Sequence, residues 1–312
     1  MGLFIQLDLF ETEKRDKIDE LLYLTGRYRN SNEFYELMEF CAKFRTLSPY
    51  NAMLVQMQRP GARYVLSASA WDKKYNTKIK LNARPLIILV PFGPVDYVFD
   101  IDETDITNKK SFLESLTDPF KTKGSIEDKI YKNLVDNLKF LGIRLESVQF
   151  GSQQNAEIRF CKEVKTIEYE FSVNKKFYKN IKLPQYYQIS VSNKNNTTDN
   201  FASIIHELGH FFCEHLITPN NKWWNPRNLS HSIKEFEAEA IAWLICERVG
   251  IINPSEKYLA GYIKQNAEIP NISIELILKA VNQIEMLFVP ISISKSFLSK
   301  NDEYVKNQLK SN

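Results

Sequence analysis

The chain has 312 residues, of which 44% are apolar and 25% are charged, and its net charge is only +3 at pH 7. This length and apolar content suffice for two compact domains, each with its own core. The composition excludes a membrane-spanning helix, because no run approaches 18 uninterrupted apolar residues, and it excludes an inhibitor that mimics DNA, because such a surface is strongly acidic.

Cysteine usage and the start of the chain predict a cytoplasmic protein. The four cysteines are dispersed and form no C-x-x-C pair, so we expect reduced core residues at Cys41, Cys161, Cys213 and Cys246. Residues 1–8 are too few for a secretory signal and lack its basic head. We therefore expect a cytoplasmic location and no membrane partner.

In chain order, the first 120 residues predict a domain of helices and short strands. Apolar residues at helical spacing predict helices at about 14–24, 31–46 and 50–58. Runs of β-branched and aromatic residues then predict strands at about 62–66, 78–80, 86–91 and 96–100. We therefore predict an α+β domain with a small antiparallel sheet over residues 1–120.

A basic stretch runs through these predicted strands. Between Arg59 and Arg84 there are seven basic residues and one acidic residue, and aromatic residues are interleaved with them. Cations that bind phosphates and rings that stack on bases are what a single-stranded nucleic acid requires. The alternative is a solvated β-ribbon whose aromatic residues belong to the core. On the first interpretation the binding residues are Arg59, Arg63, Tyr64, Trp71, Lys73, Lys74, Lys78 and Lys80.

The second half of the chain predicts another mixed domain, over residues 121–290. A polar segment at 109–123 indicates the boundary. A helix is predicted at about 125–141, and it is followed by strands near 143–150, 156–162, 167–173 and 186–191. Beyond the histidine-containing region, the pattern predicts helices at about 255–266 and 273–288 and a polar tail at 291–312.

All four histidines of the chain lie between positions 206 and 231, and two of them form His206-Glu207-Leu208-Gly209-His210. Apolar residues recur at helical spacing through this segment, after an expected N-cap at Thr198 or Asp199. Residues four apart share one face of a helix, so two imidazoles can bind one zinc ion with Glu207 beside it as a general base. A pair of core histidines satisfied by hydrogen bonds is the alternative.

A catalytic zinc ion needs a third protein ligand and a position open to water. A second predicted helix, at 229–244, has Glu235 and Glu239 on one face, whereas Glu237 points about 200° away from Glu235. We predict Glu235 as the ligand, supported by Glu239, with Glu237 as the second choice. His215 comes too early for the third histidine of H-E-x-x-H-x-x-G-x-x-H. An apolar stripe would dock this helix in the core, at Ala238, Ile241, Ala242 and Ile245.

These residues predict metal-assisted hydrolysis of a peptide bond. Zinc held by His206, His210 and Glu235 would lower the pKa of its water towards about 7 and polarise the scissile carbonyl. Glu207 would take the proton of the water and deliver it to the leaving amine. His231, one turn before Glu235, could orient a ligand or stabilise the oxyanion, although an exposed or capping role is the commoner use of such a histidine.

The motif and the second helix together resemble the ImmA/IrrE group of zinc metallopeptidases. In that group H-E-x-x-H is followed by an E-x-E-A-[ND]-x-x-A helix, and this chain has Glu235-Phe236-Glu237-Ala238-Glu239-Ala240-Ile241-Ala242. The first Glu of the family helix binds zinc, which implies that role for Glu235. Glu239 departs from the family, which usually has Asn or Asp there. The resemblance implies a zincin-like fold, in which the strand Tyr186–Val191 pairs with an extended substrate by edge addition.

The first half of the chain resembles the single-stranded-DNA-binding domain of ArdC-type antirestriction proteins. The resemblance is carried by Ser48–Pro60, by Trp71 with the basic stretch after it, and by Pro85–Pro91 and Val98–Thr104. It departs at Asn76–Ala83, where that domain has a glycine-containing basic turn. The two resemblances cover about residues 30–265 and imply a zinc ion, a protein or peptide substrate and single-stranded DNA as partners.

The sequence therefore predicts a zinc metallo-endopeptidase that cleaves a regulatory or DNA-associated protein and carries a DNA-binding domain. One alternative is an antirestriction or DNA-protecting protein of a mobile element, with a structural or vestigial zinc site. Another is a peptidase whose N-terminal domain recognises a protein. The intact Glu207 disfavours a vestigial site, because a structural site has no use for a general base.

Overall fold

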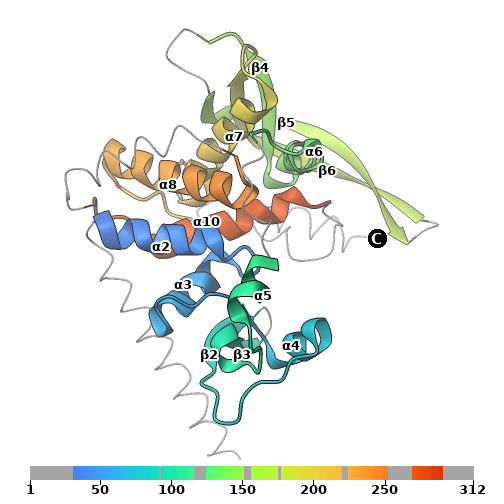
Figure 1. Cartoon of the computed structure of the whole chain (residues 1–312). Helices are drawn as coiled ribbons and strands as arrows, with labels where there is room; N and C mark the ends of the chain where they lie inside the picture. Colours follow the sequence, from blue (N-terminus) through green and yellow to red (C-terminus); the bar gives the residue numbers. More distant parts are fainter. Residues whose placement is uncertain are drawn as a thin grey trace, which may run out of the picture. The chain divides into compact units, whose positions relative to one another are not determined.

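The computed structural model describes residues 31–90, 93–115, 124–150, 156–174, 177–219, 224–251 and 269–290 (Figure 1). These residues form helices and two small sheets, so the fold is mixed α+β, as the sequence predicts. The helices predicted at 14–24 and 255–266 and the tail at 291–312 lie outside the described residues.

The chain divides into two compact units. One comprises Met1–Lys121 together with Ala260–Glu275, and the other comprises Thr122–Leu259 together with Leu276–Asn312. The first unit therefore takes in the segment 260–275, which the sequence analysis assigns to the second domain.

The first unit begins with two helices, α2 (Ser31–Lys43) and α3 (Pro49–Gln58). The side chain of Ser48 accepts a hydrogen bond from the Asn51 N–H, and Pro49 occupies the first turn of α3, where its missing N–H costs nothing. An antiparallel sheet follows in the strand order β1-β3-β2, formed by β1 (Val65–Leu66), β3 (Gly93–Asp100) and β2 (Leu86–Val90).

Helix α3 pairs with the outer edge of β2 through two side-chain amides. Asn51 donates to the Leu89 carbonyl (2.8 Å) and accepts from the Leu89 N–H (2.9 Å). Gln58 makes the same pair of hydrogen bonds with the backbone of Ile87, both at 2.8 Å. These amides satisfy backbone groups that an edge strand would otherwise leave to solvent or to another chain.

Helix α4 (Ala68–Tyr75) occupies a segment where the sequence analysis predicts no helix. Residues at its two ends fix the bounds of this helix. The Ser67 side chain accepts a hydrogen bond from the Ala70 N–H, and Asn76 ends the helix in a left-handed conformation with φ 49°. The strand predicted at 78–80 is reduced to one β-bridge between Ile79 and Thr104. The 3-10 helix η2 (Ile101–Glu103) and the helix α5 (Lys109–Ser115) complete the described part of this region.

The second unit is built on a sheet with the strand order β4-β6-β5. The helix α6 (Asp128–Leu138) and the 3-10 helix η3 (Lys139–Leu141) precede β4 (Ile143–Val148), which runs parallel to β6 (Phe177–Ser192). The strand β5 (Ala156–Asn174) is antiparallel to β6 and merges the strands predicted at 156–162 and 167–173, with a register shift between Phe160 and Lys165.

Strand β6 continues through Pro184, a residue that usually interrupts a sheet. Among the described strands, β4 pairs only with Tyr187–Ser192, so β6 has β5 as its one neighbour at Pro184, and a proline is tolerated at such an edge position. Over Tyr187–Ser192, β6 lies between β4 and β5. The prediction that this strand receives an extended substrate at its edge is therefore wrong, because both of its edges are already paired.

Two long helices follow β6, and both begin at a side-chain cap. The helix α7 (Thr197–Phe212) starts two to three residues earlier than expected, because the Asn196 side chain accepts from the Asp199 N–H. The helix α8 (His231–Val249) begins after Ser230 and ends at Gly250 in a left-handed conformation. The described chain closes with α10 (Ile274–Glu285) and the 3-10 helix η4 (Met286–Phe288).

Helices α7 and α8 pack against each other at Gly209 and Ala238. A Cβ atom placed on Gly209 would lie 3.0 Å from the Ala238 Cα and 3.3 Å from the Ala238 Cβ, so this approach requires glycine. The predicted apolar stripe of α8 is confirmed as buried, at Ala238, Ile241, Ala242 and Ile245. The close packing decides which side chains of the two helices can meet.

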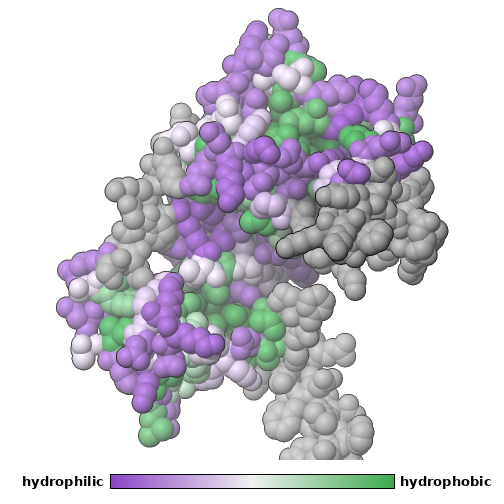
Figure 2. Space-filling view, turned by 90° about the vertical axis from the view of Figure 1, so that its right-hand side faces the viewer, coloured by the Kyte–Doolittle hydropathy of each residue, from purple (hydrophilic) through white to green (hydrophobic). Residues whose placement is uncertain are grey.

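The face of the molecule shown in Figure 2 carries many hydrophilic side chains, and apolar side chains lie between them. Two described apolar residues project strongly into solvent, namely Leu81, which is 93% exposed, and Ile217, which is 67% exposed. None of the helices that the structure describes has both the length and the apolar character needed to cross a membrane.

Replacing Gly209 with valine should lower the free energy of unfolding by about 2–3 kcal/mol, because the added side chain overpacks the contact with Ala238. Valine has a better helix propensity than glycine, so the local effect alone would be stabilising. The half-buried Ala202 of the same helix provides the control, and Ala202→Val should cost less than about 1 kcal/mol. Urea denaturation measures both, and equal losses would contradict the close-packing explanation.

Candidate metal centre

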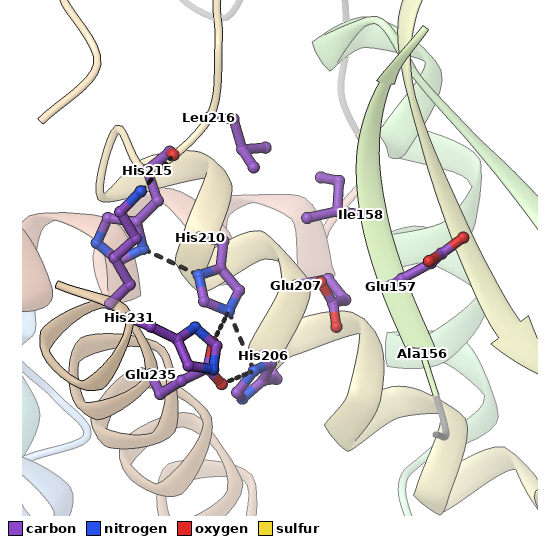
Figure 3. Close-up of a pocket in the computed structure, with 11 residues that line it drawn as sticks. Ala156, Glu157, Ile158, His206, Glu207, His210, His215, Leu216, His231 and Glu235 are labelled. Carbon is purple, nitrogen blue, oxygen red and sulfur yellow. Dashed lines mark hydrogen bonds and ion pairs between the residues drawn. The ribbon is translucent and has the colours of Figure 1, made fainter. Parts of the chain in front are cut away.

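His206 and His210 face the same side of α7 because they are four residues apart (Figure 3). Their Nε2 atoms are 3.2 Å from each other. Both rings line a pocket with a volume of about 410 Å³. The helix therefore presents two nitrogen donors to one point in space.

Glu235 reaches the same pocket from α8. Its Oε2 is 3.5 Å from the Nε2 of His206, and its Oε1 is 3.4 Å from the Nε2 of His210. Two donors bound 2.0–2.1 Å from one tetrahedral ion lie about 3.3 Å apart. The two histidine nitrogens are near this separation, and each lies at a similar distance from a different oxygen of Glu235, so the three residues are placed to hold one ion. Three protein donors would leave a fourth position for water.

Glu237 and His215 do not join this group of donors. Glu237 is fully buried, and its carboxylate accepts two hydrogen bonds from Arg227 and one from His215. The Nδ1 atoms of His215 and His210 are 2.9 Å apart. The structure thus places Glu235, rather than the second choice Glu237, beside the two histidines.

Glu239 and His231 lie at the margin of the donor group. The Oε1 of Glu239 is 3.6 Å from the Nδ1 of His206, on the side of the ring away from the other donors. His231 is the first residue of α8; its side chain is largely exposed, and its Nδ1 is 3.5 Å from the Oε1 of Glu235. It lines the pocket together with Glu235, so it can reach a molecule bound there.

Glu207 stands on the opposite side of the pocket, next to β5 (Figure 3). Its carboxyl group is buried and accepts a hydrogen bond from the backbone N–H of Ile158. Burial raises the pKa of Glu207 to about 7, although His206 and the Ile158 N–H act in the other direction. A carboxyl group with a pKa near neutrality can both accept and release a proton.

The electrostatics of His210 and Glu235 suit a cation, whereas His206 is held by nearby carboxylates. Burial lowers the pKa of His210 to about 3, and His206 adds to this effect, so the ring is neutral and its lone pair is available. Burial also acts to lower the pKa of His206, but the hydrogen bond with Glu235 and the charges of nearby carboxylates raise it above the ordinary value. The hydrogen bond with His206 lowers the pKa of Glu235, which is therefore a carboxylate.

Several residues that border the donor group are absent from the sequence-based set. Leu216, Lys234 and the first residues of β5, Ala156–Ile158, line the pocket, and Arg227 holds Glu237. No sequence pattern near Ala156–Ile158 indicates that these residues lie beside the histidines. They come far before the histidines in the chain and lie near them only because the sheet packs on α7. Arg227 could have been proposed as the partner of a glutamate on the buried side of α8.

The six basic residues predicted to bind nucleic acid fall into two groups. Arg59 contacts Glu103 at 2.6 Å and Asp102 at 3.6 Å, and Arg63 also pairs with Asp102. These arginines are held by acidic residues of the same unit, which weakens their capacity to bind phosphate. The second group is exposed to solvent and consists of Lys73, Lys74, Lys78 and Lys80. Among these, the Nζ of Lys80 donates to the Asp102 carbonyl.

The aromatic residues of this region pack on one another. Trp71 is fully buried and donates to the Phe99 carbonyl at 2.9 Å. The hydroxyl of the half-buried Tyr64 lies 3.1 Å from that of Tyr75, and both rings contact Phe112. A buried ring cannot stack on a base, so the prediction of Trp71 as a binding residue is wrong, and the indole belongs to the core.

Comparison with known proteins finds a relative of undetermined activity. The chain is 23% identical over 290 residues to an uncharacterized protein of Bacillus anthracis, pXO2-81, and the matched region covers 82% of this chain and 48% of the relative. The chain thus spans about half the length of that relative. No protein-family model matches the chain, and no solved structure matches it.

The donor geometry predicts that the purified protein retains zinc after dialysis at a ratio of one ion per chain. Glu235→Ala should reduce this ratio to nearly zero, because two histidines on their own do not hold zinc tightly. Glu146→Gln, a change on β4 outside the pocket, is the matched control and should leave the ratio unchanged. Elemental analysis measures the ratio, and full zinc retention by Glu235→Ala would rule out this ligand assignment.

Proposed function

We propose that this protein is a zinc-dependent metallo-endopeptidase with a zincin-like, ImmA/IrrE-like catalytic domain. The observation that carries the proposal is the convergence of three residues, His206, His210 and Glu235, each of which offers a ligand atom within 4.8 Å of the others. Glu207 lies at the same pocket and is not one of the donors. A set of three ligands with an adjacent carboxyl group is typical of hydrolytic zinc sites.

A zinc ion held by these donors would acidify a water molecule and polarise the carbonyl of the scissile bond. Glu207 takes a proton from the attacking water and transfers it to the leaving amine. His231 is placed at the rim of the pocket, where an imidazole N–H can donate to the oxygen that gains negative charge. Glu239 supports the ring of His206 from its Nδ1 side.

The wall formed by Ala156–Ile158 supports an extended peptide as the substrate. These residues open β5, which has β6 as its strand neighbour in the described sheet. A peptide laid along this wall in an extended conformation would carry its backbone past Glu207 and the zinc donors. We therefore propose that β5, rather than β6, pairs with the extended substrate.

The arrangement favours catalysis over a purely structural zinc site. Structural sites usually have four protein ligands, mostly cysteines and histidines, and leave no position for water. The donor group here contains three residues, none of which is a cysteine, and the cysteines at 41, 161, 213 and 246 are all buried. The general base Glu207 has no function in a closed site.

Glu207→Gln should abolish peptide hydrolysis while zinc retention stays at the wild-type level, because the amide cannot accept the proton of the water. The measurement uses a proteome-derived peptide library, with mass spectrometry to detect new N-termini after incubation with each protein. Elemental analysis of the same samples is the control for metal loss. The assignment of Glu207 fails if the variant generates the same new termini at an undiminished rate.

For the first unit we propose binding of single-stranded DNA, as the ArdC-like resemblance implies. The supporting observation is that Lys73, Lys74, Lys78 and Lys80 are exposed close together in the chain, on α4 and in the segment after it. With Trp71 in the core, binding would depend mainly on these charges and would tolerate any base sequence. If the first unit binds DNA in this way, the DNA directs the peptidase to DNA-associated proteins. The alternative function is that of an antirestriction or DNA-protecting protein whose zinc site has no catalytic activity.

Neutralising the four lysines with glutamine should weaken binding to single-stranded DNA and flatten its dependence on salt. Each lost phosphate contact lowers the slope of log affinity against log salt by about 0.7, so a reduction of about 2–3 is expected. The matched control replaces four exposed lysines elsewhere, at 110, 129, 162 and 194. Fluorescence anisotropy at several salt concentrations measures both, and equal slopes would indicate that these four lysines do not contribute to binding.

A further inference from the structure

A chain of hydrogen bonds leads from Arg227 to one of the zinc donors. The Nη1 and Nη2 of Arg227 donate to the two oxygens of Glu237 at 2.6 and 3.0 Å. The Nε2 of His215 is 2.8 Å from the Oε2 of Glu237, and its Nδ1 is 2.9 Å from the Nδ1 of His210. His215 and Glu237 are both buried, so solvent does not compete for these hydrogen bonds.

The chemistry of these groups allows only one direction for the hydrogen bonds when both rings are neutral. The Glu237 carboxylate, paired with a guanidinium, can only accept, so the Nε2 of His215 must carry the proton. The Nδ1 of His215 is then an acceptor, and the Nδ1 of His210 must donate to it. A neutral imidazole has one N–H, so the Nε2 of His210 is left with a lone pair that points to Glu235 and His206.

We propose that Arg227, Glu237 and His215 form a positioning relay that holds His210 as the Nδ1–H tautomer and thereby directs its Nε2 lone pair into the zinc site. The relay rests on the proposed function only in that a zinc ion uses this lone pair. His206 has a different support, the half-exposed Glu239 at 3.6 Å, so the two zinc histidines are oriented by separate means.

The turn that ends α7 places His215 next to His210. The N–H of His215 donates to the His210 carbonyl at 3.0 Å, and the N–H of Glu214 donates to the Phe211 carbonyl at 3.3 Å, the two hydrogen bonds of a Schellman ending. The left-handed residue of this ending, which is usually glycine, is Glu214 with φ 63°. A non-glycine residue in this conformation costs about 1–2 kcal/mol.

Neighbouring side chains hold the segment that carries His215. The Tyr187 hydroxyl of β6 donates to the Ile217 carbonyl at 2.8 Å, and the Trp224 Nε1 donates to the Leu216 carbonyl at 2.9 Å. Lys234 of α8 contacts the His215 carbonyl at 3.4 Å. The position of the His215 ring is therefore fixed by the sheet, the connecting segment and α8 together.

Cys213, His215 and Glu237 could also be taken for a second metal site, because their donor atoms lie close together. Two observations oppose this. The guanidinium of Arg227 already occupies both oxygens of Glu237, and a metal ion would have to be placed beside that positive charge. Burial and the nearby Glu237 raise the pKa of the Cys213 thiol well above its ordinary value, so it is not the thiolate that a metal binds.

The tautomers can be measured directly in the metal-free protein, since this sequence has only four histidines to contribute to the imidazole spectrum. Long-range ¹H–¹⁵N correlation spectra of a ¹⁵N-labelled sample distinguish the two neutral forms of each ring. The relay requires His210 with the proton on Nδ1 and His215 with the proton on Nε2. The opposite tautomer at either ring would overturn it, whether or not the protein binds zinc.

The variant Glu237→Gln tests the effect on the metal. Its amide can donate a hydrogen bond to the Nε2 of His215, so the proton of His215 moves to its Nδ1. The Nδ1 of His210 must then accept a hydrogen bond, and the proton of His210 moves to its Nε2. Zinc affinity, measured by competition with a chelator, should fall by about 10–100-fold. The matched control is Glu285→Gln, because Glu285 pairs with Arg248 in the same unit and lies outside the pocket.

The outcomes separate the relay from the proposed function. An unchanged zinc affinity in Glu237→Gln, or an equal loss in Glu285→Gln, would overturn the relay while leaving the zinc peptidase assignment intact. Absence of zinc binding in the wild type would overturn the assignment, and the spectra of the metal-free protein would still decide the relay. Binding of a second zinc ion that Cys213→Ala removes would also contradict the relay, since that ion would occupy its place.

Discussion

The contact between Gly209 and Ala238 is the constraint on which the candidate centre depends. His206 and His210 come from α7 and Glu235 comes from α8, so their donor atoms can converge only if the two helices approach closely. Glycine at position 209 makes this approach possible, because any Cβ there would meet the Ala238 backbone at 3.0 Å. The small residues lie one position before His210 and three positions after Glu235, next to the donors that they bring together.

The carboxylate of Glu237 on α8 is buried next to the contact between the two helices. The residues that stabilise this charge also contact a metal donor. An isolated carboxylate in the core would be strongly destabilising, but Glu237 is compensated by Arg227 and His215. Because His215 in turn contacts His210, the group that neutralises a core charge also orients a donor. Packing, charge compensation and donor orientation are therefore properties of one interface between α7 and α8.

The two units use their charged and aromatic residues differently. In the first unit, Arg59 and Arg63 are paired with acidic residues and Trp71 is in the core. The proposed binding of single-stranded DNA therefore depends on a set of exposed lysines. In the second unit, polar side chains enter a pocket whose other wall is formed by the first three residues of the strand β5, Ala156–Ile158. The proposed catalytic and nucleic-acid functions therefore rest on features of quite different kinds.

The sequence by itself determined the α+β class, the two long helices and the side of each helix on which the donors lie, because helical periodicity and the i, i+4 rule are local. It also favoured Glu235 over Glu237, because Glu235 shares one face of the helix with Glu239, one turn further on, whereas Glu237 does not. Only the tertiary structure decided that β5 rather than β6 lines the pocket and that Trp71 is buried. It also decided that His215 contacts His210 directly, with Glu237 and Arg227 behind it. The physical reason is that strand order, burial and long-range hydrogen bonds depend on which distant segments pack together, and no local pattern of residues encodes that choice.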